Sequence, residues 1–166
     1  TEQYFASHDE EVQPDYLCLA KGLTGGYLPM AATLTTQEVF NAFLGDYSEL
    51  KTFFHGHSYT GNALGSAASL ANLTLLQTKV TEAKRKKLAE NLCAESKRLG
   101  HLPQVGDIRQ AGCVLAVELV RNWQTREPFD LTEQAGIRVC SSLTKRGILT
   151  RHIGKVIVFM PPVCTT

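Results

Sequence analysis

Apolar residues near the start of the chain form two short runs, which predict two β-strands joined by a loop. The first run extends from Tyr16 to Ala20 and the second from Met30 to Leu34. Short apolar runs bounded by turn residues are typical of strands. The loop begins with Lys21 and has three glycines in its next five residues, 22–26. A lysine placed where an apolar strand ends is therefore the first candidate for chemistry.

Helical periodicity dominates the middle of the chain. Residues 35–38 have the pattern of a capping box, with either threonine as the cap, and predict a short helix through Phe43. Small and apolar residues then recur at helical spacing from Asn62 to about Gln77. A charged helix follows from about Thr81 to Leu99. Its basic run at 84–87 is interpreted as a solvated helix face balanced by neighbouring glutamates.

The pattern changes to an alternation of period two after the charged helix. Residues 105–108 and 114–120 are predicted to form sheet strands, separated by a glycine. A further helix is expected from about 132 to 146. Two short strands, 148–149 and 156–160, are expected to complete the sheet.

This order of elements indicates an α/β protein with two parts. Residues 1–80 are expected to be the end of a large α/β domain, and residues 81–166 to be a smaller α+β domain that is incomplete at its end. The chain opens with a threonine and stops a few residues after an apolar strand. A fragment of a larger protein is therefore the expectation.

Composition narrows the classes of function. A formal net charge of +1 gives no electrostatic reason to expect binding to nucleic acid or to an anionic membrane. No apolar run approaches the length of a membrane span. The five cysteines are scattered without a CxxC pair, so neither a zinc site nor a disulfide framework is indicated. A reduced, cytoplasmic, enzyme-like protein is the expectation.

Two interpretations of Lys21 follow from its local sequence. Apolar surroundings lower the pKa of a lysine, which yields the neutral amine that attacks carbonyl groups. Glycines beside it would let a bulky adduct approach the backbone. Lys21 is therefore a candidate for forming a Schiff base. The alternative, more common for local sequence alone, is a lysine that marks where a strand leaves the core.

Four segments, in the same order as in the family, resemble the class III pyridoxal-phosphate aminotransferases. The first, residues 14–29, contains Lys21 and resembles the segment that carries the cofactor lysine. The second, residues 53–65, resembles the family pattern H-G-x-T-x-x-G-N-P-L. The third and fourth, residues 106–120 and 149–162, resemble the sheet of the small domain. The resemblance implies a fold-type I transferase and spans nearly the whole chain.

The resemblance implies roles for residues that contact the cofactor, pyridoxal 5'-phosphate. Lys21 would hold the cofactor covalently and, once released, would move protons between the substrate and the cofactor. Ser58 aligns with a threonine that reaches the cofactor phosphate of the neighbouring subunit, with backbone N–H groups near Gly56 and His57 assisting. The serine keeps the hydroxyl and loses a methyl group. This contact between subunits implies a homodimer with a shared active site.

Substrate contacts are implied for a second group of residues. Arg151 aligns with an arginine that binds the substrate carboxylate, which a planar guanidinium can hold at two points. An ordinary surface arginine is the alternative. Tyr27 and Gly26 would line the pocket beside the cofactor lysine, and Gly56 would lie close to the substrate.

Two pairs of residues receive no catalytic role. Asp107 and Arg109 are expected to form a structural pair in the small domain. His55 and His57 have the H-x-H spacing of some zinc ligands, but two ligands do not make a site, and no metal is expected.

The family's aspartate that contacts the cofactor's ring nitrogen belongs to a motif, D-E-x-x-x-G-F-G-R-x-G, that this sequence lacks. The 166-residue chain alone is therefore expected to be inactive, and the full-length dimer to be an active transaminase.

Within the family, the four segments are most similar to the members that act in biotin biosynthesis. That similarity implies amino transfer to 8-amino-7-oxononanoate from S-adenosylmethionine or lysine, giving 7,8-diaminononanoate. One alternative is a class III enzyme acting on ornithine, acetylornithine or 4-aminobutyrate. Another is a non-catalytic structural or dimerisation fragment.

Overall fold

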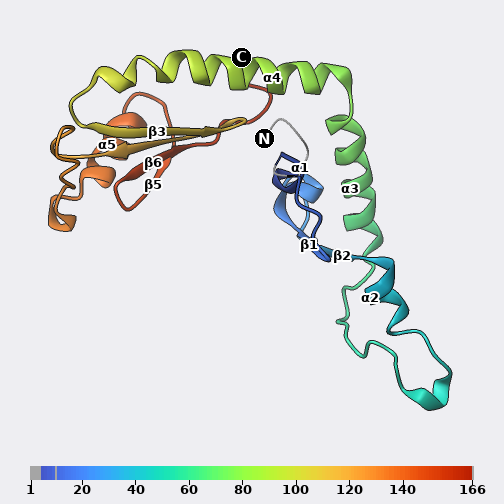
Figure 1. Ribbon diagram of the computed structural model, residues 1–166. Helices are drawn as coiled ribbons and strands as arrows, with labels where there is room; N and C mark the ends of the chain where they lie inside the picture. The colour runs from blue at the N-terminus through green and yellow to red at the C-terminus, as the bar shows by residue number, and fades with distance from the viewer. Residues whose placement is uncertain (1–4, 10, 166) are drawn as a thin grey trace. The chain divides into compact units, whose positions relative to one another are not determined.

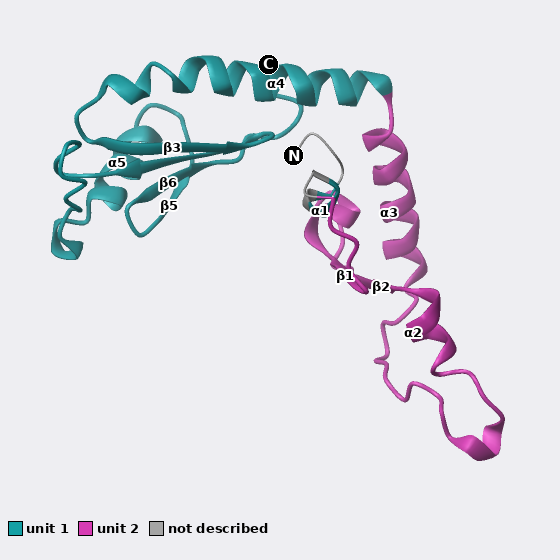
Figure 2. Ribbon diagram, viewed as in Figure 1, with its two compact units in different colours: residues 1–9, 79–166 teal, residues 10–78 magenta. Residues whose placement is uncertain are grey.

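The computed structural model describes residues 5–9 and 11–165. The chain divides into two compact units, one grouping residues 1–9 with 79–166 and the other comprising residues 10–78 (Figure 2). A short helix, α1 (Ala6–Asp9), belongs to the first unit. The sequence-based division into domains after residue 80 stays a prediction.

The unit formed by residues 10–78 begins with a two-stranded antiparallel sheet (Figure 1). Strand β1 (Tyr16–Leu19) pairs with β2 (Ala32–Thr35) along its whole length, as expected from the two apolar runs. The next helix, α2 (Gln37–Asn41), begins after Thr36, whose side chain accepts a hydrogen bond from the Val39 N–H at 3.4 Å. Thr36 is therefore the cap, and the helix ends slightly before the predicted Phe43.

The expectation of a buried strand before Lys21 is wrong for this structure. Tyr16 and Cys18 are exposed, while Leu17 and Leu19 on the other face are half-buried. A sheet of only two strands has little area with which to cover either face, so its apolar residues keep much of their surface in solvent. Burial of this strand would need further packing partners.

Helix α3 (Ala63–Leu76) follows the second motif and packs on the loop between the two strands. Its first turn is capped by Asn62, whose Oδ1 accepts from the N–H groups of Leu64 and Gly65 at 2.9 and 3.2 Å. The contact face includes the small residues Gly65 and Ser69, and Ser69 Oγ lies 3.2 Å from the Met30 sulfur. The apolar stripe that the sequence suggested for packing is exposed in this structure; its residues are Ala63, Leu64, Ala67, Leu70, Ala71 and Leu75.

The unit that contains residues 79–166 is built on a four-stranded antiparallel sheet with the order β3-β4-β6-β5 (Figure 1). Two helices accompany it, α4 and α5, with short 3-10 turns η3 (Leu99–His101) and η4 (Leu131–Glu133). The bounds are α4 Lys79–Ser96, β3 Val105–Ala111, β4 Val114–Leu119, α5 Ala135–Thr144, β5 Arg151–Ile153 and β6 Val156–Phe159.

The predicted strand at residues 148–149 is wrong, because the chain there is still leaving α5. Ile148 N donates to Leu143 O at 3.0 Å, and Gly147 has a φ of 82°. A left-handed glycine after the last turn is a common way to end a helix. The strand therefore begins only at Arg151.

The core of this unit lies on one face of the sheet. Leu115, Val117 and Leu119 alternate along β4, so their side chains point to the same face, and all three are buried. Helices α4 and α5 supply the apolar side chains that cover this face. Those side chains include Leu92, Val139 and Leu143, and Leu99 of η3 adds to them. The opposite face carries charged residues, as in antiparallel sheets with one solvated side.

Candidate active site

Lys21 is the first residue of a single-turn 3-10 helix, η1 (Lys21–Thr24), directly after β1. Its backbone φ is 47°, in the left-handed region, which costs an L-residue roughly 1–2 kcal/mol. The residue is exposed, and within the described part of the chain its amine makes no hydrogen bond or ion pair. The expectation of apolar surroundings is therefore not met in this chain by itself, because the neighbouring strand is also exposed.

The turn that follows Lys21 is held by hydrogen bonds rather than by apolar packing. Thr24 is almost fully buried, and its hydroxyl donates to Leu28 O at 2.5 Å. Gly25 and Gly26 both have positive φ, 63° and 85°. A Cβ at Gly26 would meet nothing within 4 Å, so there is open space beside the turn. The space beside Gly25 is instead filled by the side chain of Asn72, so the role of the glycines in leaving room near the lysine stays a prediction.

Tyr27 follows the glycines and is 88% exposed. Its N–H donates to Thr24 O at 3.3 Å, which keeps it on the same turn as Lys21. The ring makes no aromatic contact with the other described residues. Tyr27 is thus available to contact a ligand or another chain.

Gly56, His57 and Ser58 lie together in the irregular segment between α2 and α3, and all three are exposed. Much of this segment extends away from β1 and β2 (Figure 1). His57 N donates to Thr60 Oγ1 at 3.2 Å, and His57 Nδ1 accepts from Tyr59 N at 3.1 Å. Within the described residues, the Ser58 hydroxyl has no partner and no hydrogen bond joins this loop to Lys21.

His55 and His57, which have the spacing of some zinc ligands, lie in the same irregular segment. The His55 ring packs against Phe53, with centroids 5.4 Å apart, whereas His57 bonds within its own turn. Residues 5–9 and 11–165 include no group of three or more His, Cys, Asp or Glu side chains arranged for a metal ion. The same part of the chain contains no helix both long and apolar enough to cross a membrane.

Arg151 belongs to the other unit, where it is the first residue of β5 and lies opposite Val158 of β6. It is exposed, and its guanidinium makes no hydrogen bond or ion pair within the described residues. A guanidinium without an internal partner is free to bind a carboxylate from outside. This distinguishes Arg151 from the arginines that stabilise the sheet.

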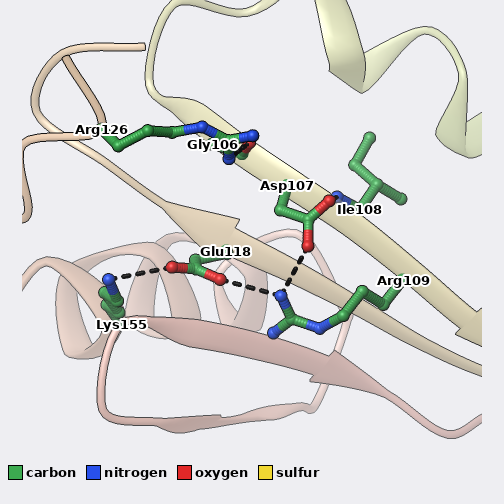
Figure 3. A network of polar contacts seen from close by, with 7 residues as sticks. All are labelled: Gly106, Asp107, Ile108, Arg109, Glu118, Arg126 and Lys155. Atoms are coloured by element: carbon green, nitrogen blue, oxygen red, sulfur yellow. Dashed lines mark hydrogen bonds and ion pairs between the residues drawn. The ribbon is translucent and has the colours of Figure 1, made fainter. Parts of the chain in front are cut away.

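Arg109 is one of those structural arginines, and it pairs with Asp107 at 2.7 Å as the sequence suggested (Figure 3). Sequence reasoning missed the rest of the network. Glu118 accepts from Arg109 at 2.8 Å and from Lys155 at 2.9 Å. Hydrogen bonds from these two cations lower the pKa of Glu118 to about 2, and the bond from Arg109 has the larger effect. Glu118 raises the pKa of Arg109 in return, and Asp107 does so to a lesser degree.

Arg126 and Arg121 are also engaged in the fold. Arg126 donates to the Gly106 carbonyl, beside the network (Figure 3). Arg121 pairs with Glu127 and Glu133, and its guanidinium carbon lies 5.7 Å from the centroid of the Phe129 ring. These contacts tie the loop after β4 to the sheet.

Asn72, in the middle of α3, is a residue near Lys21 that sequence reasoning missed. Its side-chain amide donates to Gly22 O at 2.7 Å and to Leu23 O at 3.2 Å. Asparagine is a weak helix former, because its side chain competes for backbone hydrogen bonds. The sequence does contain a signal for this contact, namely an asparagine inside an otherwise apolar helical pattern.

Comparison with known proteins assigns the family. The family model described as "Aminotransferase class-III" matches residues 1–166. The chain belongs to the class-III aminotransferases. This confirms the resemblance of the four segments and, with it, the fold class of a fold-type I transferase.

Individual relatives carry more specific names. The chain is 48% identical over 166 residues to an adenosylmethionine-8-amino-7-oxononanoate aminotransferase of Anoxybacillus flavithermus, covering 100% of this chain and 37% of the relative. It is 48% identical over 162 residues to a protein of the same name from Geobacter sulfurreducens, covering 98% of this chain and 36% of that one. The chain thus spans a little over a third of the length of these relatives.

Solved structures match the fold of the whole chain. A crystal structure of the Methanocaldococcus jannaschii adenosylmethionine-8-amino-7-oxononanoate aminotransferase matches with a TM-score of 0.93 and 42% identity, covering 100% of this chain and 39% of that chain. An ω-transaminase of Pseudomonas jessenii in complex with PMP matches with a TM-score of 0.93 and 28% identity, covering 100% and 37%.

Proposed function

We propose that the full-length protein carrying this chain transfers an amino group to 8-amino-7-oxononanoate, giving 7,8-diaminononanoate in biotin biosynthesis. The observation that carries the proposal is 42–48% identity, over the whole chain, to relatives that bear the name of this activity. Those names specify adenosylmethionine, so we propose S-adenosylmethionine rather than lysine as the amino donor.

The cofactor of the proposed reaction is pyridoxal 5'-phosphate, and the residues near Lys21 fit it. The Lys21 amine has no partner among the residues that the structure describes. The backbone after it carries no side chain at Gly22 and Gly26, where a Cβ would meet nothing within 4 Å. When bound, the cofactor supplies an aldehyde that reacts with amines and a ring that withdraws electrons from the substrate's reacting carbon.

Lys21 is proposed as the catalytic residue. Its Nζ would hold the cofactor covalently in the absence of substrate. After an incoming amine displaces it, the neutral Nζ would accept a proton from the substrate's reacting carbon. It would then donate that proton to the cofactor.

Gly56, His57 and Ser58 are proposed to bind the cofactor phosphate of a second subunit. The Ser58 hydroxyl and the backbone N–H groups of such an exposed turn are suitable donors to an anion. The absence of any hydrogen bond from this loop to Lys21, within the described residues, supports a role outside its own subunit. A homodimer with shared sites is therefore part of the proposal.

Arg151, Tyr27 and Gly56 are proposed to contact the substrate. The free guanidinium of Arg151 suits the carboxylate of 8-amino-7-oxononanoate, since a planar fork makes two parallel hydrogen bonds. The exposed Tyr27 ring offers an apolar surface on the same turn as Lys21.

A cytoplasmic location is also proposed. All five cysteines of the chain, Cys18, Cys93, Cys113, Cys140 and Cys164, are free thiols, as is usual in a reducing compartment.

A second candidate function is that of an ω-aminotransferase with another substrate. It is favoured by the fold match to the Pseudomonas jessenii ω-transaminase, although the identity there is only 28%. The alternative to both enzymatic functions is a non-catalytic, structural role for the chain.

Borohydride reduction of the full-length holoprotein separates these candidates. Peptide mapping is expected to find the reduced cofactor on Lys21, and the Lys21→Ala variant should retain none at that position. An assay of several amino donors with 8-amino-7-oxononanoate as acceptor should show turnover with S-adenosylmethionine. Trapping at Lys21 with turnover only on ω-amino substrates would favour the second candidate, and no trapping would favour a non-catalytic role.

A further inference from the structure

One side chain on α3 holds the backbone that immediately follows Lys21. The amide nitrogen of Asn72 carries two N–H donors, and both are used, toward Gly22 O at 2.7 Å and Leu23 O at 3.2 Å. The contact links residues 50 positions apart in sequence. One amide of α3 therefore holds two consecutive carbonyls of η1, in addition to the hydrogen bonds within the turn itself.

The conformation of Lys21 requires such support. A non-glycine residue with a φ of 47° is held in a sparsely populated region, which persists only when the surroundings over-determine it. Leu50 and Gln134 have similar φ values, but each of them ends a 3-10 helix, whereas Lys21 begins one. The two carbonyls clamped by Asn72 are the next ones along the chain from this strained residue.

Gly25 shows how closely Asn72 fits the turn. A Cβ at position 25 would lie 3.0 Å from Asn72 Oδ1, closer than a side chain usually approaches. The amide therefore occupies space that a residue other than glycine would take. Its Nδ2 atom faces the carbonyls of the turn, while its Oδ1 atom faces the glycine.

We propose that Asn72 is a positioning residue for Lys21, and this rests on the proposed role of Lys21 as the cofactor lysine. By fixing the carbonyls of Gly22 and Leu23, the amide sets the orientation of η1 and so the direction in which the Lys21 amine leaves the backbone. Asn72 contacts neither cofactor nor substrate in this arrangement and acts only through the turn.

The substitution Asn72→Asp tests the proposal in the full-length holoprotein. It keeps the shape of the side chain, removes both donors and places a carboxylate against two carbonyl oxygens. We expect kcat to fall about tenfold, because small displacements of a reacting group cost rate steeply, with KM for both substrates within about twofold. We also expect the midpoint of the pH titration of the cofactor's visible absorbance to move by about half a pH unit, because the amine bonded to the cofactor changes its surroundings.

Two further variants complete the experiment. Asn72→Ala removes the donors without adding charge and serves if the aspartate variant does not fold. Thr74→Ala is the matched control, because Thr74 is exposed on the same helix and its hydroxyl bonds, among the described residues, only to Leu70 O of that helix. The control is expected to keep both kcat and the titration midpoint of the parent protein.

The outcomes separate this inference from the proposed function. If the cofactor is trapped on Lys21 but the Asn72 variants keep the parent kcat and titration midpoint, the positioning role is overturned and the function stands. If kcat falls only in proportion to the folded fraction, with the midpoint unmoved, Asn72 is merely structural and the inference is again overturned. If the parent protein traps no cofactor on Lys21, the proposed function fails and the inference fails with it.

Discussion

Arg109 and Glu118 form an ion pair across β3 and β4, with Nη1 and Oε2 separated by 2.8 Å. In the register of these strands, Glu118 lies directly opposite Asp107, not opposite Arg109. Two carboxylates directly opposite each other repel and destabilise a sheet. The diagonal arginine, which also pairs with Asp107 at 2.7 Å, compensates for that repulsion.

Replacing Arg109 with methionine is therefore expected to lower the stability of the protein, because it leaves two like charges facing each other. Thermal unfolding of the full-length protein measures the loss. Adding Asp107→Asn to that variant should restore part of the stability, since it removes one of the two charges. Equal melting temperatures for the single and double variants would show that the repulsion is unimportant.

The pH dependence of stability is expected to reflect Glu118. Its pKa falls from the usual 4.5 to about 2 in the folded protein, so its contribution is fully present above pH 4.5 and is lost as the pH falls toward 2. Because Lys155 and Arg109 are about half exposed, solvent screening limits that contribution to about 1–2 kcal/mol. Glu118→Gln should narrow the difference in melting temperature between pH 6 and pH 3. An unchanged difference would contradict this assignment.

Gly136→Ala is expected to destabilise the unit built on the four-stranded sheet. A Cβ there would lie 2.6 Å from the backbone oxygen of Gly154 and 2.9 Å from His152 Cβ, so α5 and the β5–β6 turn would have to separate. A cost of about 1–3 kcal/mol is typical of such overpacking and exceeds the gain in helix propensity. Gly100→Ala is the control, since its Cβ would meet only the Ile108 side chain at 3.9 Å. Similar melting temperatures for the two variants would contradict the packing argument.

Asn62→Ala is expected to cost about 1 kcal/mol by removing the cap of α3, since Oδ1 accepts from two N–H groups of the first turn. Replacement by aspartate, which keeps an acceptor at this position, should restore most of the stability. Chemical denaturation of the three proteins measures both effects. Comparable losses for alanine and aspartate would show that the cap is not the cause.

Arg151→Gln is expected to raise KM for 8-amino-7-oxononanoate at least about tenfold, because an amide forms weaker hydrogen bonds to a carboxylate than a guanidinium does. Melting temperature should change little, since Arg151 makes no internal pair within the described residues. Arg98→Gln is the control, because Arg98 is exposed and, within the part of the chain that the structure describes, pairs only with the nearby Glu95. Similar KM values for both variants would contradict the proposed role of Arg151.

Local sequence was sufficient for most elements of the fold. Helix α3 lies within the predicted range 62–77, and β6 lies within 156–160. Periodicity and caps are local properties, so a single sequence reveals them. The strand predicted at 148–149 failed because Ile148 is still bonded to the end of α5, a contact that apolarity alone does not indicate.

The candidate site was predictable only in its residue types. Lys21, Ser58 and Arg151 were singled out by motifs, and the structure adds that each is exposed without an internal partner among the described residues. The pairing of Asp107 with Arg109 followed from their spacing on one strand. Glu118 and Asn72 were missed because their partners lie on other elements, so only folding brings them together.

From the order of residues alone came the family, the succession of strands and helices, and the lysine after the first strand. These depend on short segments, whose side-chain chemistry and spacing are the same whether or not the chain is folded. The left-handed conformation of Lys21 and its bracing by Asn72 arise only when α3 packs on the loop after β1. The charge network that joins β3 and β4 to Lys155, in the turn between β5 and β6, likewise depends on strand register. Such contacts join residues distant in sequence, and only the tertiary structure places them within hydrogen-bonding distance.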